Sequence, residues 1–317
     1  MDVFLSIVLL IVGMALLIKG ADFFVDGASQ VAKAMKIPSL IIGLTLVSIG
    51  TSMPEMSVSI QSAIQNLDDM SFGNVVGSNI FNTFVVIGAS ALFTTLTVSN
   101  DMKKYDIPIL IGIYLILILF GFVIGPFEVT LIESILIFSL LFIYTFFLIY
   151  RSRKEKSEEE NTKQRKWYFN VLFIILGLAG IIFGGDLVVD NAVVLATKLG
   201  MSELLVGLTI VAVGTSLPEL VTSMVAAKKG ENDIAVGNAI GSSIFNIILI
   251  LGLSGIISPY AVGESYLIDL MVMLCSAVII LIMSMTDGKI GKGKGIILIM
   301  IYALYLTYII LRNMGMM

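Results

Sequence analysis

Long and nearly uninterrupted apolar blocks divide this sequence, and they limit its fold more than any other feature. Ten blocks can be counted, at about 3–25, 39–64, 72–97, 107–124, 129–150, 167–189, 203–228, 235–259, 266–285 and 294–311. A helix needs about 20 apolar residues to cross ~30 Å of hydrocarbon, whereas a transmembrane β-barrel shows short alternating segments. The blocks therefore predict an all-α polytopic membrane protein with ten transmembrane helices.

One charged segment, RSRKEKSEEENTKQRK at 151–166, separates two sets of five blocks. The chain is only 13% charged overall, against about 25% in a typical soluble domain, so this cluster stands out. We interpret it as a solvated linker between a first five-helix repeat, 1–150, and a second, 167–317.

The basic residues lie mostly in alternate loops. Sixteen Lys and Arg fall in or beside the loops at 26–38, 98–106, 151–166, 229–234 and 286–294, and two fall on the other side. The positive-inside rule places the basic loops in the cytoplasm. We predict a multi-pass cell-membrane protein with both termini extracellular and the 151–166 loop cytoplasmic.

The two halves are related by an internal repeat. With an offset of 164, residues 43–90 align with 207–254 without gaps, and 21 of the 48 positions are identical. The matches include Gly, Thr, Ser, Pro, Glu and Asn, which chance similarity between apolar helices does not produce. Because each half has an odd number of spans, the second half is expected to have inverted topology, the usual architecture of secondary transporters.

Within this repeat, GTSMPEM at 50–56 places a proline and a carboxylate inside an apolar span. Pro54 has no N–H and clashes with the carbonyl four residues earlier, that of Gly50. Irregular backbone at membrane depth persists only where it is buried or lines a polar cavity. Freed carbonyls and the Glu55 carboxylate are hard oxygen ligands suited to Na⁺, Ca²⁺ or Mg²⁺.

The second half repeats this pattern as GTSLPEL at 214–220, with Glu219 after its own proline. In both copies a Thr and a Ser precede the glutamate by four and three residues, so they share its helical face. Two such glutamates in related positions indicate an ion site better than a structural hydrogen bond.

A second motif follows in each half, GNVVGSNIFN at 73–82 and GNAIGSSIFN at 237–246. Ser78 and Asn82, and likewise Ser242 and Asn246, are spaced i,i+4 and could face the glutamates across a helix pair. The alternatives remain open: the glycines suit close helix packing, and the asparagines suit interhelical hydrogen bonds.

Together these motifs resemble the two α-repeats of the calcium/cation antiporter superfamily, and in particular the prokaryotic sodium/calcium exchangers. The resemblance implies ten helices, four adjoining ion sites at the bilayer centre, and sliding of spans 1 and 6 against the other eight. It implies that Glu55 and Glu219 are the calcium-binding carboxylates and that sodium uses the same two carboxylates. The remaining implied ligands are Thr51, Thr215, Ser52, Ser216, Ser78 and Ser242, with Asn82 and Asn246 at the middle site and backbone oxygens at Ser48 and Ala212. Potassium-dependent exchangers carry Asp where this chain has Asn246, which argues against potassium dependence.

The predicted function is therefore Ca²⁺/Na⁺ antiport, with both ions as substrates in a lipid bilayer. We predict no cofactor, no enzymatic activity, no nucleic-acid binding and no obligate protein partner. Proton/calcium exchange, or transport of another divalent cation, is the main alternative, since protons can also neutralise two carboxylates. An intramembrane hydrolase would need a nucleophile and base or a catalytic metal, and the chain has no histidine. A channel would not need the duplicated carboxylate pair.

Overall fold

The structure is a computed structural model that describes residues 3–313 apart from 125–126, 155–166, 201–211 and 265. Eight helices in the described part are long and apolar enough to cross a membrane, and one bent pair provides a ninth. These agree with nine of the ten predicted blocks. The block at 203–228 lies partly outside the described residues, where α11 (Ala212–Gly214) and α12 (Leu217–Lys228) form its described end.

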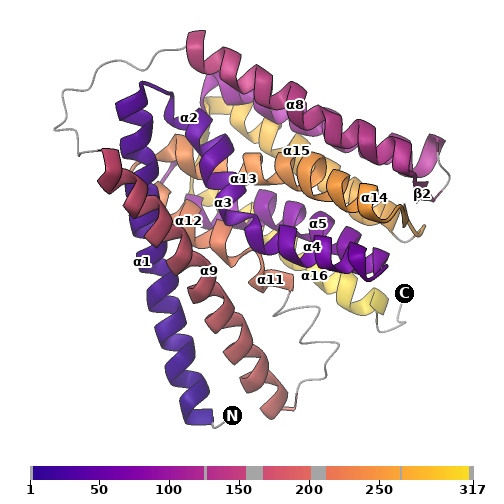
Figure 1. The fold of residues 1–317 in the computed structure, drawn as a ribbon, viewed down its shortest axis with the longest axis horizontal. Coiled ribbons are helices and arrows are strands. Elements are labelled where there is room, and N and C mark those ends of the chain that lie inside the picture. Colours follow the sequence, from indigo (N-terminus) through magenta and orange to yellow (C-terminus); the bar gives the residue numbers. More distant parts are fainter. Residues whose placement is uncertain (1–2, 125–126, 155–166, 201–211, 265, 314–317) are drawn as a thin grey trace.

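Helices account for nearly all of the regular structure (Figure 1), including π-helical segments, labelled η, within or next to α-helices. The first half comprises α1 (Val3–Met35), α2 (Ser39–Ile42), η1 (Gly43–Val47), α3 (Ser48–Thr51), α4 (Met53–Ile64), α5 (Asp68–Phe81), η2 (Asn82–Val86), α6 (Ile87–Phe93), η3 (Met102–Asp106), α7 (Ile107–Ile118), η4 (Leu119–Ile124) and α8 (Leu131–Lys154). The second half continues with α9 (Trp167–Lys198), α11, α12, α13 (Asn232–Phe245), η6 (Asn246–Leu251), α14 (Gly252–Ile257), α15 (Tyr266–Asp287) and α16 (Lys292–Asn313).

Two very short strand pairs join loops that are far apart in the sequence, a feature that the all-α prediction did not include. The strand β1 (Leu96–Thr97) pairs antiparallel with β4 (Lys289–Ile290), and β2 (Glu128–Val129) pairs with β3 (Tyr260–Ala261). Each pair joins two loops that the charge pattern assigns to the same side of the membrane. The structure is therefore consistent with the predicted alternation of loops.

Helices α1 and α9 form a closely packed pair along one flank of the molecule (Figure 1). Glycines allow their backbones to touch: a Cβ added at Gly20 would lie 2.6 Å from Ile181 N, and one at Gly177 would lie 2.5 Å from Phe24 N. Such close approach is the usual role of small residues in membrane helix pairs. The pair is therefore expected to behave as one rigid unit.

The most deeply buried spans run through α5, η2 and α6 and through α13, η6 and α14. Every residue of α13 from Ile234 to Phe245 is buried. By contrast, α1, α8 and α16 carry large exposed apolar side chains, such as Phe4, Phe146 and Leu304, as expected of helices facing lipid. The two buried spans enclose the site described next.

Candidate ion-binding site

The predicted helix interruptions are present at both proline motifs. The helices on either side of Ser52, which end at Thr51 and begin at Met53, are bent by 51°. The backbone of Ser52 leaves helical geometry at φ −82°, ψ 9°, and that of Ser216 does the same at φ −91°, ψ 6°. Each proline lies in the first turn of the following helix, where its missing N–H costs no internal bond.

These interruptions place Glu55 and Glu219 in the first turns of α4 and α12, and both residues are completely buried. The serine of each motif donates a hydrogen bond to the glutamate of the other. Ser52 Oγ lies 2.8 Å from Glu219 Oε1, and Ser216 Oγ lies 3.0 Å from Glu55 Oε1. The related motifs of the two halves therefore meet in one site and complete each other.

The serines of the second motif lie in the same hydrogen-bonded cluster. Ser78 Oγ lies 3.1 Å from Ser216 Oγ. Ser242 Oγ lies 3.3 Å from Glu219 Oε1 and 3.3 Å from the carbonyl oxygen of Ser48. That carbonyl is therefore directed into the site, whereas for Ala212, the related residue in α11, the described contacts give no role.

The two motif threonines differ in their surroundings. Thr51 is completely buried, and its hydroxyl lies 3.0 Å from Asn238 Oδ1 and 3.3 Å from the carbonyl oxygen of Ser48. The hydroxyl of Thr215 is buried and has no hydrogen-bond partner among the described residues. The two halves are therefore related in sequence but not equivalent in this conformation.

The asparagines at the end of the second motif begin the π-helical segments η2 and η6. Asn246 donates from Nδ2 to Asn79 Oδ1 at 3.0 Å, which is the interhelical bond that the alternative reading proposed, while its own Oδ1 is buried without a partner. Within the described ranges, neither amide atom of Asn82 has a hydrogen-bond partner. These amide oxygens lie at π-bulges, which are common at functional sites, but no hydrogen bond connects them to the glutamates.

The site is rich in oxygen and lacks a compensating cation within the described part of the chain. One carboxylate oxygen of each glutamate, Oε2, is buried and has no hydrogen-bond partner in the part of the chain that the structure describes. No basic side chain in the described ranges forms an ion pair with Glu55 or Glu219. Buried charges are stable only when they are paired or coordinate a metal ion, so this arrangement favours bound cations.

Sequence reasoning missed two asparagines that support the glutamates. Asn74 Nδ2 donates to the carbonyl oxygen of Glu55 at 3.2 Å, and Asn238 Nδ2 donates to that of Glu219 at 3.3 Å. Each amide also bonds a serine on the same helix as its glutamate, Ser59 or Ser223, at 2.9 Å. The signal was available, because Asn74 and Asn238 are an identical pair in the repeat.

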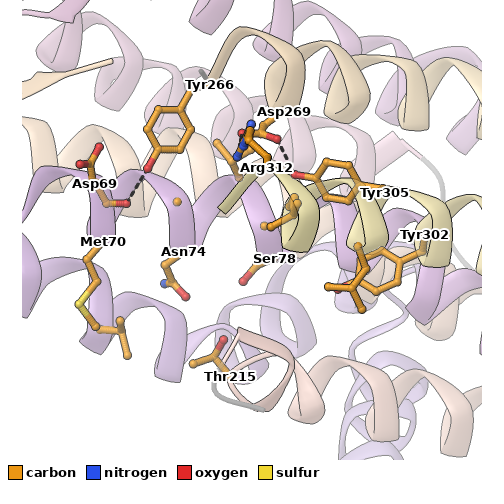
Figure 2. Close-up of a pocket in the computed structure, with 16 residues that line it drawn as sticks. Asp69, Met70, Asn74, Ser78, Thr215, Tyr266, Asp269, Tyr302, Tyr305 and Arg312 are labelled. Carbon is orange, nitrogen blue, oxygen red and sulfur yellow. Dashed lines mark hydrogen bonds and ion pairs between the residues drawn. The ribbon is translucent and has the colours of Figure 1, made fainter. Parts of the chain in front are cut away.

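A cavity of about 400 Å³ adjoins the site on one side (Figure 2). Its inner wall includes Ser78 and Thr215, and its outer part includes Asp69, Asp269 and Arg312 at helix ends. Arg312 Nη2 lies 3.0 Å from Asp269 Oδ2. The site is therefore reached from the end of the molecule where α5 and α15 begin and α16 ends.

A buried oxygen site between two related helix interruptions, within a bundle of apolar helices, defines a membrane cation transporter. The chain belongs to the sodium/calcium exchanger protein family, whose model matches residues 5–150 and 169–311, and thus to the calcium/cation antiporter superfamily.

Similar proteins agree with this assignment. The chain is 37% identical over 306 residues to the inner membrane protein YrbG of Escherichia coli, covering 93% of each chain. It is 34% identical to the sodium/calcium exchanger MaX1 of Methanosarcina acetivorans, covering 95% of this chain and 97% of that one. A solved structure of the sodium-calcium exchanger NCX_Mj, soaked with 10 mM Na⁺ and zero Ca²⁺, superposes with a TM-score of 0.83 at 29% identity and covers 96% of this chain and 99% of that one.

Proposed function

We propose that this protein is a secondary active antiporter that exchanges Ca²⁺ for Na⁺ by alternating access. The observation that carries the proposal is the pair of buried glutamates. Each accepts a hydrogen bond from the serine of the other motif, Ser52 or Ser216, and the Oε2 atoms of both glutamates have no basic partner in the described residues. Oxygen donors of this kind suit Ca²⁺ and Na⁺. Membership in the exchanger family supports the same ions.

The proposed ligands are the two carboxylates together with the hydroxyl and carbonyl oxygens around them. The set consists of Glu55, Glu219, Ser52, Ser216, Ser78, Ser242, Thr51, Thr215, Asn82, Asn246 and the backbone oxygens of Ser48 and Ala212. The crossed serine–glutamate bonds support the central members, and the unpartnered amide oxygens support Asn82 and Asn246.

The charge balance explains why exchange is obligatory in this proposal. Two ionised carboxylates in a medium of low dielectric constant repel each other and are costly to bury without compensation. One Ca²⁺ or two Na⁺ cancel this charge. An empty site keeps two negative charges and therefore resists the movement that would carry it across the membrane.

The moving element in this proposal is the α1–α9 pair, sliding against the remaining helices. Its glycine-lined contact supports movement as one unit. We further propose ten spans in two inverted repeats, with both termini outside and the 151–166 loop in the cytoplasm. The cavity beside Ser78 then opens to the extracellular side, and the structure represents an outward-facing state.

The test is calcium uptake into proteoliposomes with sodium, potassium or a pH gradient imposed separately. Uptake that requires an outward-directed sodium gradient and ignores potassium supports the proposal. Uptake that follows a pH gradient and ignores sodium refutes sodium coupling and favours proton/calcium exchange.

A further inference from the structure

Among the described residues, the hydrogen bond that joins a threonine of one half to an asparagine of the other exists in only one of its two related positions. Thr51, from the first half, lies with its hydroxyl 3.0 Å from Asn238 Oδ1 in the second half. The offset of 164 relates these residues to Thr215 and Asn74. Thr215 Oγ1 has no hydrogen-bond partner in the described residues. Figure 2 shows Thr215, in the turn between α11 and α12, and Asn74, on α5, beside the cavity with no bond drawn between them.

The packing around the two asparagines differs in the same sense. Near Asn238, a Cβ added at Gly241 would lie 2.8 Å from Leu44 Cα, and one at Gly237 would lie 3.2 Å from the backbone of Gly43. The helix α13 therefore packs closely against η1. We call this the sealed side of the site, in contrast to the open side, where the cavity lies. Near Asn74, the related Gly77 lines the cavity; residues 207–211, which the repeat relates to η1, lie outside the described part of the chain.

Both asparagines nevertheless hold their own glutamate-bearing helix in the same way. Each Nδ2 donates to the carbonyl oxygen of Glu55 or Glu219 and to a serine one turn further on. The amide nitrogen is therefore engaged on both sides of the site, whereas the amide oxygen is bonded to a threonine only on the sealed side.

We propose that Asn74 and Asn238 are positioning residues of the exchange site, and that each accepts a hydrogen bond from the threonine of the other half only when its side is sealed. In the state shown here Thr51 bonds Asn238 and the opposite side is open. In the alternate state Thr215 bonds Asn74, and Thr51 releases Asn238. This inference rests on the proposed alternating access, and it assigns the two asparagines a role as closing contacts.

The test reads conformation directly, by thiol labelling, and calcium flux is measured separately. In a Cys275→Ser background, Val58→Cys reports the open cavity, which Val58 lines, and Thr222→Cys reports the related position on the sealed side, where Thr222 is completely buried. Purified protein without Ca²⁺ or Na⁺ is treated with a charged, water-soluble thiol reagent. A single hydrogen bond of this kind corresponds to an about three- to tenfold change in the equilibrium between the states.

Thr51→Val should slow labelling at Val58→Cys and accelerate it at Thr222→Cys, because it weakens the sealed side. Thr215→Val should have the opposite effect, because it weakens the alternate state. Opposite signs for two related substitutions are not expected from general destabilisation, which would accelerate labelling at both reporters.

Two further variants sharpen the result. Thr51→Ser keeps the hydroxyl donor and should restore the labelling pattern of the parent protein. Thr45→Val is the matched control. In the described residues the hydroxyl of Thr45 bonds only the carbonyl oxygen of Ile41, one turn earlier in the same span, so this variant should leave both labelling rates unchanged.

The proposal is overturned if Thr51→Val and Thr215→Val change the labelling rates in the same direction. It is also overturned if Thr45→Val changes these rates as much as Thr51→Val does. If Thr51→Val cannot be purified, Thr215→Val alone tests the proposal. Faster labelling at Thr222→Cys in that variant refutes the proposal. Calcium flux measured in parallel separates the two hypotheses. If the two threonine variants shift labelling in opposite directions but calcium flux is not coupled to sodium, the proposed function is refuted and the positioning role stands. If flux is coupled to sodium but the labelling shifts are not opposite, only the positioning role is refuted.

Discussion

Replacing Glu219 with glutamine tests the ion site through stability as well as transport. In the absence of ions, the wild-type carboxylate carries the cost of a buried charge, which amounts to several kcal/mol. Ser52 and Ser242 offset part of this cost with two hydrogen bonds to Oε1, at 2.8 and 3.3 Å. Bonds to a charged group are worth about 1.5–3 kcal/mol each.

The carboxamide of Glu219→Gln changes both sides of this balance. It carries no charge, but its two hydrogen bonds fall to about 0.5–1.5 kcal/mol each, and its Nε2 takes the place of Oε2, which has no partner, at a cost of about 1–3 kcal/mol. The two balances are similar, so the ion-free stability should stay within about 2 kcal/mol of the wild type.

The response to calcium should differ strongly. At a Ca²⁺ concentration 100 times its Kd, binding to the folded state stabilises the wild type by about 2.7 kcal/mol. Glu219→Gln removes one of the two carboxylates and should lose nearly all of this increment, together with calcium transport. The assay is thermal unfolding in detergent followed by circular dichroism, with and without Ca²⁺.

A matched control is Glu133→Gln. Glu133 is also a buried glutamate near a helix start, but its carboxylate accepts hydrogen bonds from the backbone N–H and the hydroxyl of Thr130, in a separate part of the chain. Its calcium response should match that of the wild type. An undiminished calcium-induced increment in Glu219→Gln would refute the proposed site.

Three further substitutions follow from the structure. Asn246→Asp replaces the donor to Asn79 Oδ1 with a third carboxylate that Ca²⁺ alone cannot neutralise, so calcium flux should gain a new dependence on pH, sodium or potassium. Flux that depends on all three as in the wild type would show that this side chain lies outside the site. In Gly20→Val, the new Cβ alone would lie 2.6 Å from the α9 backbone, so the substitution should separate α1 from α9 and sharply reduce calcium flux. Unchanged flux in a monodisperse protein would contradict the interpretation of α1 and α9 as a rigid pair. Arg151→Met removes one partner of a buried ion pair, the guanidinium that lies 2.8 Å from the Asp106 carboxylate, which should cost about 3–5 kcal/mol. Chemical denaturation should register that loss, and a change below 1 kcal/mol, on the order of a surface ion pair, contradicts the prediction.

Much of the fold could be predicted from the sequence because its signals are local. The length of each apolar block is set by the thickness of the bilayer, and nine of the ten predicted spans are present in the described residues. A proline two residues later, Pro54 or Pro218, explains the helix interruptions at Ser52 and Ser216, because proline lacks an N–H and its ring clashes with the preceding turn. The short strand pairs between distant loops were not predicted, because two-residue strands carry no periodic pattern.

The candidate site was predicted in part for the same reason. The repeat indicated that Glu55 and Glu219 are related, and helical spacing placed a serine near each. The sequence did not show that each serine bonds the glutamate of the other half, since this depends on how two distant helices cross. Asn74 and Asn238 were missed because their role is to bond a carbonyl oxygen of a neighbouring helix, a contact that no spacing along one chain segment reveals.

The sequence by itself determined a membrane bundle with two copies of one kinked, oxygen-rich motif. Only the tertiary structure decided which copy is sealed and which faces a cavity. The physical reason lies in the repeat itself: nearly identical motifs can exchange their environments, so local chemistry is the same in both arrangements. The choice between them is made by long-range contacts, the Thr51–Asn238 hydrogen bond and the close packing of Gly241 against η1 among them.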